Sequence, residues 1–131
     1  MARFARLIVP GYPHHVTQRG VRSVEIFAND EDRFAYLEFM KEESLRFGVS
    51  FVTWCLMTNH VHLIAIPEVD DSLARAIGEA HRRYTRRKNF AEGVRGYLFL
   101  EKGIVTFYFR SSIRPTLGMN ILIGARKRGN A

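Results

Sequence analysis

The chain has 131 residues, enough for one domain with a packed core and too few for two. Its hydrophobic share of 47% and charged share of 25% are ordinary for a globular protein, and its apolar runs all stay short of the roughly 18 residues that a membrane span needs. The net charge of +7 and the isoelectric point of about 10.1 predict a polyanionic partner, nucleic acid before an anionic membrane, with a basic surface kept for solubility as the plain alternative.

Cysteine usage indicates the compartment. Cys55 is the single cysteine, so the chain forms no internal disulfide and a reducing environment fits it best. The N-terminus has no apolar stretch typical of a signal peptide. We therefore expect a cytoplasmic protein without a membrane partner, in which Cys55 is inert packing inside a strand.

The first predicted element is a strand over Tyr12–Arg19, after a Pro-Gly break. Side chains alternate between the two faces of a strand, so His15, Thr17 and Arg19 are expected on one face.

A helix follows this strand. Its cap is Asn29 or Asp30, acidic residues occupy its first turn where the helix dipole favours them, and Gly48 is a natural stop. Apolar residues with roughly helical spacing are expected to support the core: Phe34, Leu37, Met40, Leu45 and Phe47.

Two strands come next, over Val49–Leu56 and His60–Ile66, joined by a tight connection at Met57–Asn59. A second helix begins near Asp70–Ser72, and Gly93–Leu100 is predicted to be a further strand. The apolar stripe of the second helix consists of Leu73, Ile77, Ala80 and Tyr84.

The order β-α-β-β-α-β predicts an α+β fold, a ferredoxin-like antiparallel sheet with two helices on one face. The other face would then be free to meet a ligand.

His60 and His62 stand two residues apart within an apolar strand, so both imidazoles project from one face. Such a pair can share one divalent metal ion if other ligands complete the shell. The plain alternative is two polar residues on a wet sheet face.

The second helix carries a basic run: Arg82, Arg83, Arg86, Arg87 and Lys88. A favourable interaction with the helix dipole would explain a basic helix end. The net charge and the neighbouring histidines instead favour contact with DNA phosphates. Arg19, on the face of His15, is expected near a metal or a phosphate.

The aromatic residues allow two interpretations. Tyr84 falls on the apolar stripe and is predicted to pack in the core. Tyr12, Tyr97 and Phe99 could stack on unpaired bases or pack inside the protein.

Several segments in this order resemble the HUH (His, hydrophobic, His) single-tyrosine transposases, and among them the REP-associated branch. Tyr12–Gly20 is similar to the family's Tyr-His-Val-Thr-x-Arg-Gly strand, and Ile26-Phe27 followed by Asn29–Asp32 is similar to its entry into the first helix. Cys55–Leu63 resembles its histidine motif, with Thr58 where the family has proline. Further likenesses are Arg83–Asn89 and Gly96–Phe99.

The resemblance covers about residues 1–101, and it implies a transposase-like domain at 1–102. It implies that His60 and His62 hold Mg²⁺ or Mn²⁺, that the protein binds single-stranded or hairpin DNA as a homodimer, and that a tyrosine cleaves and rejoins the strand through a 5′-phosphotyrosine link.

The chain departs from the family after Lys102. The family's nucleophile lies on a C-terminal helix near Tyr-x-x-x-Asn-Pro-Val-Arg, and no such stretch occurs here. Residues 103–131 are expected to be a divergent segment, part strand and part disordered tail, as in a frameshifted or truncated gene product. Tyr108, on a strand-like run, is the candidate nucleophile that remains, and impaired or absent cleavage is predicted.

Two alternatives to a transposase stay open. One is a catalytically inactive module that binds single-stranded or hairpin DNA. The other is a metal-dependent nuclease that activates water at the histidine pair and needs a nearby carboxylate, for which Glu68 and Asp70 are candidates.

Overall fold

The fold is an antiparallel sheet covered on one face by two helices. The computed structural model describes residues 8–99 and the backbone of residues 104–107. The elements in chain order are β1 (His14–Arg19), the short 3-10 helix η1 (Val21–Ser23), α1 (Asp30–Phe47), β2 (Val49–Leu56), β3 (His60–Pro67), α2 (Ser72–Glu92) and β4 (Ile104–Phe107). The strands lie in the order β2-β3-β1-β4 and every neighbouring pair is antiparallel, which confirms the predicted ferredoxin-like α+β class.

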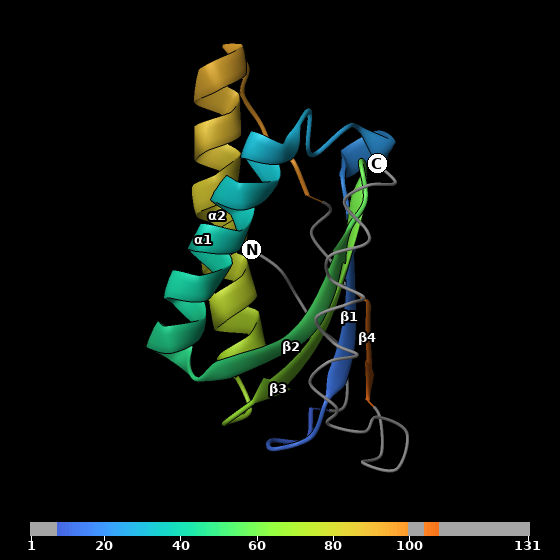
Figure 1. Ribbon diagram of the computed structural model, residues 1–131, viewed down its shortest axis with the longest axis vertical. Helices are drawn as coiled ribbons and strands as arrows, with labels where there is room; N and C mark the ends of the chain where they lie inside the picture. The colour runs from blue at the N-terminus through green and yellow to red at the C-terminus, as the bar shows by residue number, and fades with distance from the viewer. Residues whose placement is uncertain (1–7, 100–103, 108–131) are drawn as a thin grey trace.

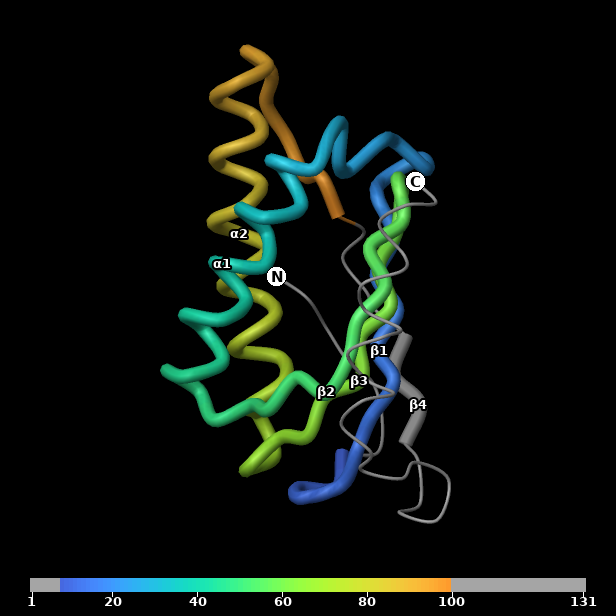
Figure 2. Tube along the Cα trace, viewed as in Figure 1, coloured from blue at the N-terminus to red at the C-terminus, as the bar shows by residue number. Residues whose placement is uncertain are grey.

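The two helices lie side by side on one face of the sheet, and the core fills the space between the layers (Figures 1 and 2). From the sheet, Val16, Val61 and Leu63 point into this core, where Tyr36 and Tyr84 pack edge to face against each other. The opposite face of the sheet is not covered by any described helix. None of the helices in the described ranges has the length and apolar character needed to cross a bilayer.

The buried stripe of α1 differs from the one predicted. Phe34 is 66% exposed and Leu45 is 80% exposed, so the prediction that these two support the core is wrong. The buried stripe runs instead through Asp32, Tyr36, Met40 and Glu43. Its two acidic members pair with basic residues of α2, and the contact between the helices therefore combines an apolar middle with ion pairs.

The predicted strand at Gly93–Leu100 is also wrong. The helix α2 runs on to Glu92 and ends at Gly93, whose φ of 68° is left-handed, and Gly96 has a φ of 103°. Two such glycines interrupt extended backbone, so residues 93–98 form a loop. The strand that completes the sheet is β4, which pairs with β1.

The turn between β2 and β3 is held from outside the hairpin. Its residues are Met57–Asn59, as predicted. The amides of Ile26 and Phe27 donate to the Thr58 carbonyl at 2.7 and 3.3 Å, and the Gly20 amide donates to the Asn59 carbonyl at 3.0 Å. These bonds fix the backbone that leads directly into His60.

Candidate metal and nucleic-acid site

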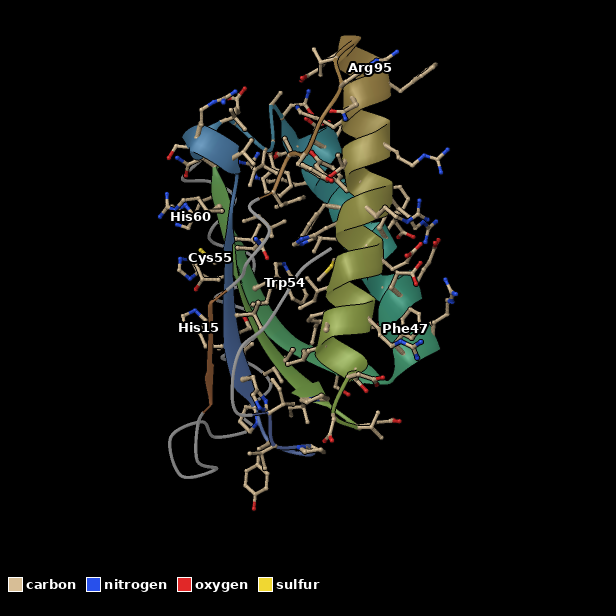
Figure 3. The ribbon with its side chains drawn as sticks, turned by 180° about the vertical axis from the view of Figure 1, so that it is seen from behind. His15, Phe47, Trp54, Cys55, His60 and Arg95 are labelled. Atoms are coloured by element: carbon tan, nitrogen blue, oxygen red, sulfur yellow. The ribbon has the colours of Figure 1, made fainter. Side chains whose placement is uncertain are left out.

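The predicted histidine pair lies on the uncovered face of the sheet. In the register of β1 and β3, Thr17 is opposite His62 and Arg19 is opposite His60, which places these four side chains on one face. The ring centroids of His60 and His62 are 4.9 Å apart. In Figure 3, His60 lies on the side of the sheet away from the helices.

Two neighbours that sequence reasoning did not assign to the site orient these rings. Asn59 Oδ1 accepts from His60 Nδ1 at 2.8 Å, which leaves the lone pair on Nε2. His15 Nε2 lies 3.0 Å from His62 Nδ1, the two rings stack, and Thr17 Oγ1 is 3.3 Å from the same Nδ1. The strand alternation placed His15 on the correct face, but its contact with His62 depends on the register between β1 and β3.

All three imidazoles of this face have a lowered pKa, which favours their neutral form. Burial lowers the pKa of His60, and the nearby His62 and Arg19 lower it further. Burial and then Arg19 lower the pKa of His62, and burial and then His62 lower that of His15. Neutral imidazoles are the form that binds a divalent metal, so the chemistry of this pair fits a cation.

The part of the chain that the structure describes does not complete a metal site beside the pair. Among the described residues, no group of three or more His, Cys, Asp or Glu side chains is arranged to hold a metal ion. Glu68 and Asp70, the predicted nuclease carboxylates, follow Pro67 at the end of β3 opposite to His60. Among the described residues no carboxylate forms a metal-holding group with the histidine pair, so this part of the structure supplies none to a water-activating nuclease.

The basic run lies on α2, on the other side of the sheet from the histidines, and most of it is engaged in ion pairs. Arg82 pairs with Glu79, Arg83 with Glu42 and Glu43, and Arg87 with Asp32. Lys88 is 4% exposed, and its Nζ lies 3.0 Å from carboxylate oxygens of Asp32 and Glu92.

Lys88 is thus a buried structural residue and is not placed to reach a phosphate. Because α2 continues past it to Glu92, the run is not the helix end that the sequence predicted. Arg86 is exposed and forms no ion pair within the described part of the chain. Arg19 is exposed and lies opposite His60, so of the predicted DNA-binding residues it is the one on the histidine face.

Three of the described tyrosines, Tyr12, Tyr36 and Tyr84, lie away from the histidine pair. Tyr36 and Tyr84 are fully buried on the helix side, where burial raises the pKa of both hydroxyls, and Tyr84 donates to the Ile26 carbonyl at 2.7 Å. Packing of Tyr84 was predicted and is confirmed. Tyr12 precedes β1 at the end remote from His60.

Phe99 and Tyr97, which were predicted either to stack on bases or to pack inside the protein, have different environments. Phe99 is buried and stacks on His81 with ring centroids 3.9 Å apart, so it is a core residue. Tyr97 is 84% exposed and stays available for stacking. Tyr108 lies outside the described residues. Phe107, just before it, is opposite His14, at the end of the sheet away from His60.

Comparison with known proteins finds the same fold in two solved structures. No protein-family profile matches the chain, and no curated protein is significantly similar to it in sequence. A solved structure of a REP-associated tyrosine transposase bound to a REP hairpin superposes with a TM-score of 0.63 and 15% identity, covering 94% of this chain and 68% of that one. A protein assigned to the transposases, from Deinococcus radiodurans, superposes with a TM-score of 0.62 and 15% identity, covering 82% of this chain and 87% of its own. At this identity the likeness shows a shared fold.

Proposed function

We propose that this chain is a DNA-binding protein of the HUH single-tyrosine transposase type, which holds single-stranded or hairpin DNA against the open face of the sheet beside a divalent cation. The observation that carries the proposal is the pair His60 and His62 on that face, with each Nδ1 engaged by a neighbour. The REP-associated neighbour was solved with a hairpin, which makes hairpin DNA the first ligand to test.

The roles follow from the geometry of the face. His60 and His62 would hold Mg²⁺ or Mn²⁺ through Nε2, and water or a phosphate oxygen would complete the shell. When bound, the cation would offset negative charge on a phosphodiester. Arg19, opposite His60, is placed to pair with a phosphate next to it. A cytoplasmic homodimer is part of the same proposal, and sedimentation equilibrium measures the assembly directly.

A second candidate function, a module that binds DNA without cleaving it, is favoured by the positions of the tyrosines. Strand cleavage needs a tyrosine oxygen that can align with the phosphorus at the cation site. No tyrosine within residues 8–99 contacts either histidine of the pair, since Tyr36 and Tyr84 are enclosed in the core on the other side of the sheet.

The first prediction is DNA binding without efficient covalent cleavage. After incubation with a single-stranded hairpin oligonucleotide and Mn²⁺, mass spectrometry should find the protein without a tyrosine-linked nucleotide, while a gel shift at the same concentrations shows binding. A robust adduct would contradict the binding-only function and would identify the nucleophile, and Tyr108→Phe would then test the remaining candidate.

The second prediction concerns Arg19. Changing Arg19→Ala should remove one phosphate contact, so the slope of log K against log salt should become shallower by about 0.7 on single-stranded DNA. Arg46→Ala is the matched control, because Arg46 is 62% exposed on α1, pairs with Glu43 at 3.1 Å and is not on the histidine face. Equal slopes for the parent and the Arg19 variant would place the DNA away from β1.

A further inference from the structure

The C-terminal end of α2 and the loop after it expose large aromatic rings. Phe90 is 90% exposed and Tyr97 is 84% exposed, which is unusual for side chains of this size. An open cavity of about 580 Å³ is lined by Phe90 together with Arg86, Arg87 and Arg95. A larger neighbouring cavity is lined by Tyr97 and shares Arg86 with the first. These five residues are called the aromatic–arginine patch below.

The patch carries positive charge that the rest of the described chain does not neutralise. Arg86 and Arg95 are exposed, and neither forms an ion pair with another described residue. This distinguishes them from Arg83, which is held by Glu43 at 2.7 Å. Arg87 is 40% exposed at its side chain although it contacts Asp32 at 3.0 Å. Exposed guanidinium groups beside exposed rings are suited to a ligand with phosphates and unpaired bases.

The loop that carries Arg95 and Tyr97 is fixed at both of its ends, and the other three residues of the patch lie on α2. At the helix end, the Val94 amide donates to the Asn89 carbonyl at 3.0 Å, and Asn89 Nδ2 donates to the Gly96 carbonyl at 2.9 Å. At the sheet end, the Val21 amide donates to the Leu98 carbonyl at 2.8 Å. The rings and guanidinium groups are therefore presented from an ordered backbone.

The patch and the histidine pair lie at the same end of the molecule. Phe99 forms an isolated bridge with Gly20, which directly follows Arg19, the residue opposite His60. In Figure 3, His60 lies on the side of the sheet away from the helices, and Arg95 lies at the end of α2 on the helix side. A strand held at the histidines can reach the patch by passing over this end.

We propose that the aromatic–arginine patch binds unpaired bases of the same DNA strand that the histidine face holds, with bases stacked on Phe90 and Tyr97 and phosphates paired with Arg86 and Arg95. The inference rests on the proposed DNA-binding function and adds a subsite to it. A second copy of the chain is a poorer occupant, because a symmetric contact here would bring guanidinium groups of both copies together.

The test compares binding of a fluorescent 20-nucleotide oligo-dT with that of a blunt duplex of equal length, measured by anisotropy. The Phe90→Ala, Tyr97→Ala double variant should bind the single strand about 5- to 150-fold more weakly per stacked base lost, with less than about twofold change for the duplex. The Arg86→Ala, Arg95→Ala variant should bind both DNAs more weakly and show a shallower salt slope. Phe34→Ala is the matched control, because Phe34 is a 66% exposed ring on α1 outside the patch.

The outcomes distinguish a failure of the proposed subsite from a failure of the proposed DNA-binding function. A parent protein that binds neither DNA would overturn both. If the parent binds oligo-dT and the double aromatic variant binds it equally well, the patch is not a base-binding subsite and the proposed function stands. If that variant changes the sedimentation mass and leaves DNA affinity unchanged, the patch is an interface between copies and the inference is wrong.

Discussion

Replacing His60 and His62 together with alanine is expected to abolish Mn²⁺ binding, as measured by isothermal titration calorimetry. The two imidazoles share one face, and each is fixed by a neighbour at Nδ1. Loss of a residue that merely supports a metal ligand costs about 10- to 100-fold in affinity, so loss of both ligands should weaken binding by more than about 100-fold. Equal heats from the parent and the double variant would contradict the assignment of a cation site to His60 and His62.

Two further variants locate the effect on this face. His14→Gln is the control, because His14 belongs to the same strand as His15 but is buried on the helix side of the sheet, where its Nε2 accepts from the Val9 amide at 3.0 Å. Once a thermal melt shows that it folds, this variant should bind Mn²⁺ like the parent. His15→Gln should lower affinity by about tenfold, as expected for a residue that orients a metal ligand.

The second large effect concerns stability. Asp32→Ala is expected to destabilise the fold by about 3 kcal/mol, since it removes one partner from a buried ion pair and leaves the Lys88 ammonium with Glu92 alone. For a domain of this size, that loss lowers the melting temperature by roughly 10 °C. Asp30→Ala is the matched control in the same helical turn, because Asp30 is 64% exposed and pairs with Arg33 at 3.5 Å, so its loss should cost less than about 1 kcal/mol.

The Asp32 carboxylate also makes the stability of the fold depend on pH in the acid range. Burial alone would raise the pKa of Asp32, but the Ala28 amide and then Lys88 and Arg87 outweigh it, so the folded-state pKa lies below the ordinary value. The ionised Asp32 carboxylate therefore contributes its full stabilisation of the fold above the unfolded-state pKa of about 4. This stabilisation is lost as pH falls through the lower folded-state pKa. Denaturant melts at falling pH should show a smaller loss for Asp32→Asn than for the parent. An identical pH dependence would contradict the assignment.

The first three strands and both helices were predictable because their patterns are local, whereas the fourth strand was predicted at Gly93–Leu100 and lies at Ile104–Phe107. The Asn29 cap, the stop at Gly48 and the buried stripe of α2 can all be found from residue type and spacing. The stripe of α1 could not be found in this way. Its buried face includes Asp32 and Glu43, so a search for apolar periodicity selected the exposed Phe34 and Leu45 instead.

The candidate site was predictable in part for a similar reason. The shared face of His60 and His62 follows from strand geometry alone. The contact of His15 with His62 depends on the pairing of β1 with β3, which no local pattern specifies. Likewise, the burial of Lys88 depends on its partner Asp32 on α1. The sequence alone therefore predicted one DNA-binding surface for the whole basic run, although its residues have different partners.

The turn between β2 and β3 has a consequence for how the protein opens. Its carbonyls accept amides from Gly20, Ile26 and Phe27, so it is bonded to the segment that leads into α1. This turn cannot fray by itself, because its opening breaks hydrogen bonds in a part of the chain far away in sequence. The histidine-bearing end of the sheet and the entry to α1 therefore belong to one cooperative unfolding unit, in contrast to the many binding loops that open at low free energy. A ligand arriving at His60 meets backbone that is already ordered, and its affinity is not reduced by the entropy of folding a loop.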